Sequence, residues 1–511
     1  MEAFNIVDLF FESAERTPGK TAIVYKGEKI SFGEFRGQVT ATATYFLSKG
    51  IRKGDRVMLF VPMSFDLYRI VLALFKIGAT AVFLDEWVGK KRMEECCKIA
   101  QCKAFIGIFK ARVLSVFFAE LRKIPIHLGV NYKIVPLTEA FPLTTKDDTA
   151  LITFTTGSTG KPKAAKRTHG FLSAQFKALI NKIEPKEDDI DMPVLPIVLL
   201  INLGAGTTSV IADFKASKPT SLQPEKIIEQ LKLNNVNRMI ASPFFIKEIS
   251  KHVIKHKIAL PQLQKIFTGG APVFPGEAKI YHTAFPDAQV QIVYGSTEAE
   301  PISAIDVNEL VKNTNNILEE GLNVGQPDQS ATVKIIKITE EILTLNNEEE
   351  LKALELDGTA IGEIIVSGDH VLREYFNNEE ALKRNKIFIG EKCWHRTGDS
   401  GYLGANGNLF LTGRCATLIH RDGKIIAPFI YENFFQTITG VEMGTVMLPD
   451  NKLLVIVELT DAAEKKIVTE KINSCELIFD KIIFLEKIPR DQRHNSKIDY
   501  GLLKDEVKKQ L

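Results

Sequence analysis

The segment 154–163 has the composition of a phosphate-binding loop. It combines short hydroxyl side chains, glycines and lysines, and it follows an apolar run, 150–154, that predicts a buried strand. Glycines let backbone N–H groups approach an anion closely, while hydroxyls and lysines add donors and positive charge. Pro162 excludes a Walker loop, because a helix cannot simply begin at Lys161. A plain surface turn is the alternative for this segment taken alone. The residues that we expect to contact phosphate are Thr155, Thr156, Gly157, Ser158, Thr159, Gly160 and Lys163.

Four later segments carry side chains suited to a nucleotide. Segment 294–298 places a carboxylate, Glu298, beside hydroxyl groups after a strand, and such an oxygen cluster can hold Mg²⁺. In segment 268–272, two glycines would let the backbone lie flat along a planar ring. Segment 394–399 ends in Thr-Gly-Asp, and the carboxylate of Asp399 could accept hydrogen bonds from two ribose hydroxyls. Each of these segments, taken alone, also fits a turn with a solvated side chain.

Together with the segment 493–498, which contains Lys497, these motifs resemble in order those of the adenylate-forming superfamily. That superfamily includes acyl-CoA synthetases, luciferases and the adenylation domains of peptide synthetases. The resemblance covers nearly the whole chain. It implies that ATP binds through the phosphate loop, through Tyr294, Gly295 and Ser296, through an adenine loop of Gly269, Gly270, Ala271 and Pro272, and through Asp399 and Arg414.

The resemblance also implies the chemistry. Thr297 contacts the α-phosphate, Glu298 serves the metal, and Lys497 bridges the substrate carboxylate and the α-phosphate. The reaction joins a carboxylate to ATP, giving acyl-AMP and pyrophosphate. A carboxylate must attack an already anionic phosphate, so a cation aimed at the transition state lowers the barrier. Mg²⁺ neutralises the leaving pyrophosphate.

The chain departs from an ordinary acyl-CoA synthetase in ways that bear on the second step. Ala416 stands where many members carry Asp or Lys at the pivot, Ala164 replaces a glycine, and 195–200 lacks the usual histidine. These departures, with segments 270–275, 294–301 and 493–497, most resemble the β-lactone synthetases of bacterial olefin biosynthesis. That resemblance implies a β-hydroxy fatty acid whose own hydroxyl displaces AMP, in an apolar pocket whose candidate wall is 194–203.

Two other readings stay open. Gly423, after the pivot, is retained as in enzymes that form thioesters, so a fatty acyl-CoA ligase, which would need coenzyme A, or a carrier-protein-loading ligase is the alternative. A nucleotide-binding regulatory or scaffold protein without turnover is a remote third. A decayed enzyme should lose Lys497, Glu298 or Asp399 first, and all three are present. Segment 85–87 (Asp-Glu-Trp) matches no pattern, and the acid's identity and chain length do not follow from the sequence.

The elements that must position these residues alternate between strand and helix. Thr21–Tyr25 and Lys29–Ser31 predict a hairpin, and Ser31 with Glu34 predicts a capped helix. Such alternation indicates layered α/β architecture with mostly parallel sheets, to which we add a smaller β-rich part. We expect a large N-terminal domain, residues 1–413, and a small mobile α+β domain, 414–511, that carries Lys497. We expect segment 339–356, with its run of three glutamates, to be a solvated helix or insertion.

Composition narrows the class of protein. With 511 residues, 45% apolar and 25% charged, the chain has the composition of a multidomain globular enzyme. The formal net charge of +2 implies no nucleic-acid partner. Six scattered cysteines, no signal peptide and no membrane-spanning segment favour a cytoplasmic protein. We expect a small carboxylic acid as substrate, and the oligomeric state is not predicted.

Overall fold

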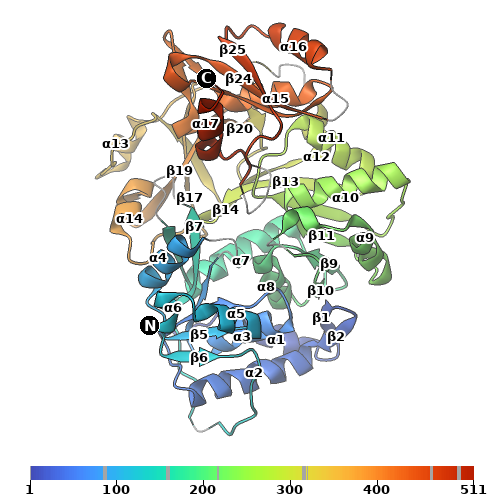
Figure 1. The fold of residues 1–511 in the computed structure, drawn as a ribbon. Coiled ribbons are helices and arrows are strands. Elements are labelled where there is room, and N and C mark those ends of the chain that lie inside the picture. The colour runs from blue at the N-terminus through green and yellow to red at the C-terminus, as the bar shows by residue number, and fades with distance from the viewer. Residues whose placement is uncertain are drawn as a thin grey trace.

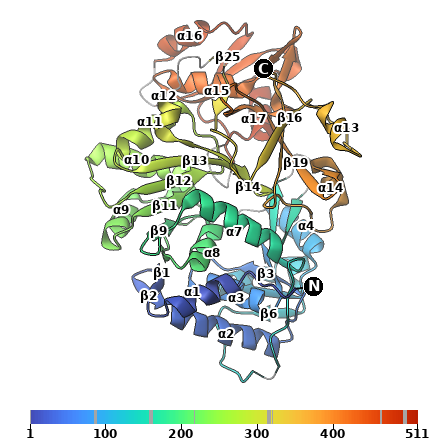
Figure 2. The same cartoon turned by 180° about the vertical axis from the view of Figure 1, so that it is seen from behind.

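The computed structural model describes residues 2–84, 89–137, 139–156, 162–215, 218–312, 318, 320–460, 464–491 and 497–510. Two large sheets, a third antiparallel sheet and a C-terminal α+β part make up the described chain (Figures 1 and 2). No helix in these ranges is long and apolar enough to cross a membrane. The cysteines, all within these ranges, form no disulfide.

The first large sheet has six strands in the order β6–β5–β3–β4–β7–β8. All neighbouring pairs are parallel except the final β7–β8 hairpin, whose two strands flank the predicted phosphate loop. The strands are β3 (Arg56–Phe60), β4 (Thr80–Phe83), β5 (Ala104–Gly107), β6 (Ile126–Leu128), β7 (Thr149–Thr156) and β8 (Pro162–Thr168). Pro162 therefore begins a strand and not a helix, as the sequence predicted.

The second large sheet has eight strands, in the order β14–β13–β12–β11–β9–β10–β1–β2. It too is parallel at its centre, with an antiparallel pair at each edge. Its strands are β1 (Thr21–Tyr25), β2 (Glu28–Ser31), β9 (Ile190–Pro193), β10 (Thr208–Val210), β11 (Arg238–Ala241), β12 (Lys265–Gly269), β13 (Gln289–Ser296) and β14 (Ala299–Asp306). The central parallel strands are apolar on both faces of the sheet, so both faces must be covered, and helices provide this cover.

Helices pack between and around the two sheets. Both views show α7 (His169–Ile183) in the middle of the molecule, between the large sheets. The Ser31–Glu34 capping box is formed and begins α2 (Phe32–Ser48). The other helices up to residue 312 are α1 (Asp8–Arg16), α3 (Phe65–Lys76), α4 (Lys90–Ala100), α5 (Phe109–Ser115), α6 (Ala119–Arg122), α8 (Pro196–Ala205), α9 (Pro224–Leu233), α10 (Pro243–His256), α11 (Pro275–Ala284) and α12 (Val307–Lys312), with the 3₁₀ turn η1 (Pro219–Ser221).

A third, antiparallel sheet follows and carries the Thr-Gly-Asp segment. Its order is β15–β20–β19–β17–β16, with β18 beside β19. Segment 339–356 was expected to be a solvated helix or insertion, and it does contain the short helix α13, in which Glu348 and Glu349 are exposed. Its leucines, however, pack on the hydrophobic cluster that contains Trp394: Leu343, Leu345, Leu351 and Leu354. The elements are β15 (Leu322–Asn323), β16 (Thr332–Ile336), α13 (Glu348–Lys352), β17 (Gly362–Ser367), α14 (Glu379–Asn385), β18 (Lys386–Ile389), β19 (Lys392–Leu403) and β20 (Leu409–Arg414).

The last hundred residues form a small α+β unit of their own. Its two hydrophobic clusters draw their buried members from 419–507 alone. Its elements are η2 (Cys415–Thr417), β21 (Ile419–Arg421), β22 (Lys424–Ile426), α15 (Pro428–Thr437), β23 (Val441–Met447), η3 (Pro449–Asn451), β24 (Leu454–Leu459), α16 (Lys465–Asn473), β25 (Lys481–Leu485) and α17 (Tyr500–Lys508). The predicted division at 413/414 falls at the end of β20 and stays a prediction.

Candidate active site

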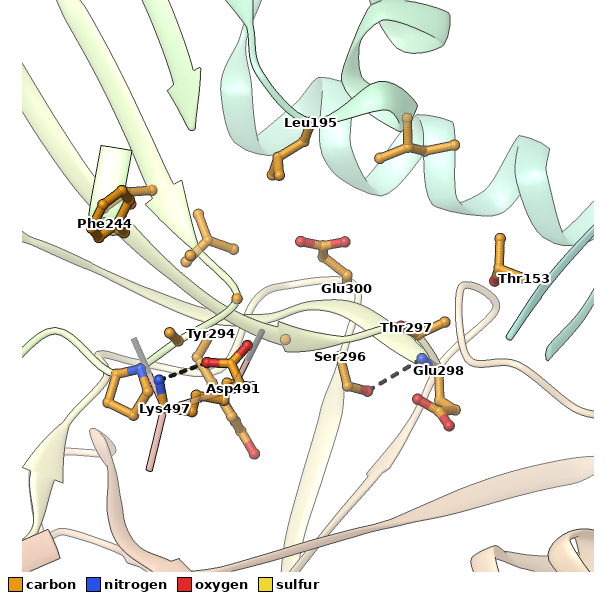
Figure 3. Close-up of a pocket in the computed structure, with 18 of the residues that line it drawn as sticks. Thr153, Leu195, Phe244, Tyr294, Ser296, Thr297, Glu298, Glu300, Asp491 and Lys497 are labelled. Carbon is orange, nitrogen blue, oxygen red and sulfur yellow. Dashed lines mark hydrogen bonds between the residues drawn. The ribbon is translucent and has the colours of Figure 1, made fainter. Parts of the chain in front are cut away.

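One large cleft, with a volume of about 2180 Å³, contains most of the predicted site. Its walls come from both large sheets, from α7 and α8, from the third sheet and from the C-terminal unit. Figure 3 shows Tyr294, Ser296, Thr297, Glu298 and Lys497 among its lining residues. The cleft has a polar part and an apolar part, and the two differ in the chemistry that they can hold.

Asp399 is the centre of the polar part. Its carboxylate accepts a hydrogen bond from the Tyr294 hydroxyl at 2.8 Å and one from Arg414 at 2.6 Å. Burial, together with the Asp399 charge, raises the pKa of Tyr294 well above its usual value. Asp399 also raises the pKa of Arg414. The structure thus brings Tyr294 to Asp399 across 105 positions of sequence and to Arg414 on the strand beside Asp399, and all three are predicted to bind the nucleotide.

A buried ion pair fixes the backbone that carries Asp399. Arg396 donates to Glu363 at 2.9 and 2.6 Å, and both side chains are nearly inaccessible to solvent. Glu363 also accepts from the Gly398 N–H at 3.3 Å. Gly398 has φ +69°, a conformation that favours glycine. The Thr-Gly-Asp motif therefore needs its glycine for an irregularity within β19, where the pairing with β17 shifts register, and Asp399 lines the cleft just after it.

The Gly269–Pro272 loop begins where β12 ends, beside β13. A Cβ on Gly269 would lie 2.4 Å from the Val293 carbonyl oxygen, and Gly270 has φ +86°, so both positions require glycine. Thr268, just before the loop, has a buried hydroxyl that finds no hydrogen-bond partner in the described ranges. All four predicted loop residues line the cleft. The loop thus presents backbone at close range to whatever occupies the polar part.

Glu298 and Thr297 lie at the β13–β14 turn. The Glu298 carboxylate accepts a hydrogen bond from the Tyr375 hydroxyl at 3.1 Å. The backbone N–H of Glu298 donates to Ser296 Oγ at 3.3 Å. The Thr297 carbonyl accepts from Arg167 at 3.1 Å. Within the described ranges, no cluster of three metal-ligating side chains surrounds Glu298. A Mg²⁺ held there needs most of its ligands from phosphate and water, which is how this ion usually binds.

Two lysines place positive charge near Glu298, one in the cleft and one buried behind its wall. Lys163, predicted to bind phosphate, donates to Asn385 at 3.0 Å, and burial lowers its pKa. Lys386 is 3% exposed, its Nζ finds no hydrogen-bond partner in the described ranges, and burial lowers its pKa to about 8. Its ammonium lies 5.8 Å from the Tyr375 ring centre. Lys163 can therefore contact a polyanion in the cleft, whereas Lys386 does not line the cleft and can only add to the positive charge behind it.

The rest of the predicted phosphate loop is only partly covered by the structure. Thr155 and Thr156 are the last residues of β7. Gly157, Ser158, Thr159 and Gly160 lie outside the described residues, as do 85–87 and 493–496. The β7–β8 hairpin pairs Thr156 with Pro162 and Thr155 with Lys163. The two ends of the loop are therefore adjacent, and Lys163 is the loop residue whose side chain the structure places in the cleft.

Lys497 lines the same cleft from the C-terminal unit. Its N–H donates to the Asp491 carboxylate at 2.8 Å, which Figure 3 draws as a dashed line. The bridge between Arg490 and Ile498 closes the segment, and Arg490 is held by a buried pair with Glu458 at 3.0 Å. The segment is thus anchored in the C-terminal core while its lysine faces residues of the N-terminal part.

The apolar part is walled by α7, α8 and the ends of neighbouring strands. The run 194–203, a candidate wall in the sequence, is mostly the helix α8, and Leu195, Ile197, Val198, Leu200 and Ile201 line the cleft. Leu199 and Leu203 instead point into the core. Glu300 also lines the cleft, and Figure 3 shows its carboxylate on the Leu195 side of the β13–β14 turn, opposite to Glu298. This part offers an apolar surface containing a carboxylate.

Sequence reasoning missed Tyr375, Lys386 and Glu300 as parts of the site. Tyr375 and Lys386 lie far along the chain from Glu298, in segments without any motif. Glu300 had a signal, because it is two residues after Glu298, and along β14 it is less buried than Ala299 and Pro301, which leaves it facing the cleft.

Comparison with known proteins agrees with this geometry. The AMP-binding enzyme family matches residues 10–376. An olefin β-lactone synthetase of Xanthomonas campestris pv. campestris is 30% identical over 75% of this chain and 72% of its own length. Another olefin β-lactone synthetase, from Stenotrophomonas maltophilia, is 27% identical over 86% and 84%.

A solved structure has the same fold. The O-succinylbenzoate coenzyme A synthetase of Bacillus subtilis, in complex with ATP and magnesium ion, superposes with a TM-score of 0.81 at 19% identity, covering 97% of this chain and 99% of that one. The family match spans more than half of the chain. The chain therefore belongs to the AMP-binding enzyme family and is an AMP-forming carboxylate ligase.

Proposed function

We propose that this enzyme adenylates a 3-hydroxy fatty acid and then closes it to a β-lactone, releasing AMP. The observation that carries the proposal is that a single cleft contains both the residues expected to bind ATP and an apolar wall that includes the Glu300 carboxylate. The relatives named olefin β-lactone synthetases support the second step.

In the first half-reaction, Tyr294 stacks on adenine while Asp399 and Arg414 hold the ribose. The predicted phosphate loop and Lys163 bind the triphosphate, and Thr297 contacts the α-phosphate. Glu298 holds Mg²⁺, which neutralises charge on the departing pyrophosphate. Lys497 steadies the attacking carboxylate and the α-phosphate as negative charge develops between them. Acyl-AMP and pyrophosphate result.

In the second half-reaction, the substrate's own hydroxyl is the nucleophile. Its oxygen bonds to the acyl carbon, the bond from that carbon to the phosphate oxygen breaks, and AMP leaves. Glu300 accepts the hydroxyl proton, since its carboxylate faces the apolar part where the acyl chain lies. The nucleophile is already tethered, so positioning in a dry pocket supplies much of the rate.

The residues after Arg414 support a second step without an external thiol. Ala416, in η2, carries no charge with which a pivot could be anchored. We propose a boundary near 413/414 and rotation of the C-terminal unit between half-reactions, because Lys497 enters the cleft from that unit. Gly423, with φ +73°, lies in the turn between β21 and β22, and this glycine is the residue on which the thioester-forming alternative depends.

The proposed function is tested by product analysis with two acids, each in the presence and absence of coenzyme A. The enzyme is given ATP, Mg²⁺ and either a long-chain 3-hydroxy acid or its unsubstituted analogue, with and without coenzyme A. A β-lactone from the hydroxy acid without coenzyme A is the expected result. AMP release only when coenzyme A is present, with a thioester as product, would instead establish an acyl-CoA ligase. Absence of pyrophosphate exchange with any acid would favour a non-catalytic nucleotide-binding protein.

Glu300→Gln separates the two steps within the same assay. The variant should keep acid-dependent pyrophosphate exchange, because adenylation does not use the hydroxyl. Lactone release should fall by about 10²-fold or more, the usual contribution of a positioned base. Equal lactone rates for wild type and variant would remove Glu300 from the mechanism and leave the lactone reaction itself standing.

A further inference from the structure

The helix α5 and the turn after it present an apolar face to solvent. Phe109 is 79% exposed and Phe117 68% exposed, with Val113 at 49% and Val116 at 59% between them. Phe109 and Val113 are four residues apart and share one side of α5. Val116 and Phe117 follow in the turn that ends the helix, where their N–H groups donate to the Val113 and Leu114 carbonyls. The opposite side is occupied, since Ser115 is buried and Ala111 packs against a core cluster. The face is therefore a coherent patch and not scattered exposure.

Positive charge surrounds this patch. Segment 109–123 carries Lys110, Arg112, Arg122 and Lys123 against a single carboxylate, Glu120. The four cations are all exposed, and Lys123 is paired with Glu120 at 2.8 Å. A second carboxylate, Glu94 of α4, accepts from the Ala119 N–H at 3.2 Å, so four cations face two carboxylates and an excess of positive charge remains. An apolar face bordered by such cations is complementary to an anionic lipid surface, where aromatic side chains insert and cations meet headgroups. A protein partner of this chain's own kind would bring the same positive charge, which disfavours a second copy.

The patch also lies beside the wall of the cleft. Strands β3 and β5 are parallel neighbours, with Phe60 opposite Gly107, and the Ile108 N–H donates to the Phe60 carbonyl at 3.2 Å. The chain leaving β3, Phe60 to Met63, lines the cleft, while the chain leaving β5 enters α5. Neighbouring strands are only ~5 Å apart. Figure 1 shows α5 and α6 at the outside of the molecule next to β5 and β6.

We propose that the α5 face, Phe109, Val113, Val116 and Phe117 with its flanking cations, docks the enzyme on anionic membranes. The docking places the apolar part of the cleft next to the lipid phase, in which long-chain acids are dissolved. The docking itself does not depend on whether a lactone or a thioester is the product, so its test measures binding and not turnover.

The experiment is vesicle flotation of the full chain. Vesicles contain either phosphatidylcholine alone or equal parts of phosphatidylcholine and phosphatidylglycerol. Wild type should float with the anionic vesicles and much less with the neutral ones. The double variant Phe109→Asp, Phe117→Asp should lose binding by at least about tenfold, because two inserted rings are removed and two like charges added. The double variant Lys110→Gln, Arg112→Gln should bind anionic vesicles more weakly than wild type, and its binding should depend less on salt concentration.

The matched control is Leu233→Asp, since Leu233 is 79% exposed on α9, far from α5 along the fold. It should bind as wild type does, and all variants should unfold at the wild-type temperature because the altered side chains are on the surface. Failure of wild type to float, or equal loss in the Leu233 control, would overturn the proposal. So would self-association of wild type that the Phe109 and Phe117 changes abolish without any vesicle binding, because the face would then join two copies.

Discussion

An ion pair between the two parts of the chain offers a test of how Lys497 is brought to the cleft. Lys247 of α10 lies 3.2 Å from Glu442 of β23 and 3.6 Å from Glu277 of α11. Burial acts to lower the pKa of Lys247, but the two carboxylates outweigh it and the pKa is raised. The same lysine lowers the pKa of Glu442 against the opposing effect of burial. The pair therefore favours the arrangement in which Lys497 faces the nucleotide residues.

Glu442→Gln removes one charged contact between the two parts and leaves the Lys247–Glu277 pair and the Phe274–Phe429 ring contact intact. At 3.2 Å, the attraction is of the order of 5 kcal/mol before desolvation and side-chain ordering are subtracted. Both groups are partly exposed, so the net loss should be about 1–2 kcal/mol. The population with Lys497 in place should then fall roughly 5- to 30-fold relative to the open arrangement.

The assay is ATP–pyrophosphate exchange with a saturating acid, measured at low and high salt. The variant should lose exchange rate and most of its salt dependence, with unchanged global unfolding. Glu15→Gln is the control, because Glu15 of α1 pairs with Arg36 of α2 at 2.7 Å and neither residue lines the cleft. Exchange at the wild-type rate in Glu442→Gln, or an equal loss in both variants, would refute the reasoning.

Three further outcomes are expected. Lys497→Ala should abolish adenylation and leave folding intact, whereas normal exchange by a folded variant would remove its assigned role. Asp399→Asn should raise the KM for ATP about tenfold or more, since a charged acceptor is worth ~1.5–3 kcal/mol; unchanged ATP affinity would contradict ribose binding. Lys386 has a folded pKa of about 8 against 10.5 ordinarily, so the unfolded chain binds more protons between these values. Stability of wild type relative to Lys386→Met should thus rise with pH across this window by up to ~3 kcal/mol, and a flat difference would contradict the shift.

Local patterns in the sequence were sufficient to predict much of the architecture. The capping box at Ser31 and Glu34 gave the start of α2, and Pro162 correctly excluded a helix after the glycine-rich loop. These signals are short-range, since each depends on neighbours within a few residues. The layered α/β fold followed from the alternation of strands and helices.

The contacts that complete the site could not be predicted, because they join distant segments. Nothing near Lys386 in the sequence distinguishes it from a solvated lysine, and only tertiary packing leaves it 3% exposed. Tyr375 donates to Glu298 across 77 positions of sequence. The charges of segment 339–356 predicted its exposed helix, but they did not reveal that the leucines between them pack on a hydrophobic cluster of the third sheet.

The acid's carboxylate oxygens provide the most direct test of the central claim. A 3-hydroxy acid labelled with ¹⁸O in both carboxylate positions is given to the enzyme with ATP and Mg²⁺, without coenzyme A, and AMP and lactone are analysed by mass spectrometry. Attack of the carboxylate on ATP followed by attack of the hydroxyl predicts one ¹⁸O in AMP and one in the lactone. Unlabelled AMP beside a lactone that keeps both ¹⁸O atoms would show that the hydroxyl had been activated instead, and would contradict adenylation of the carboxylate.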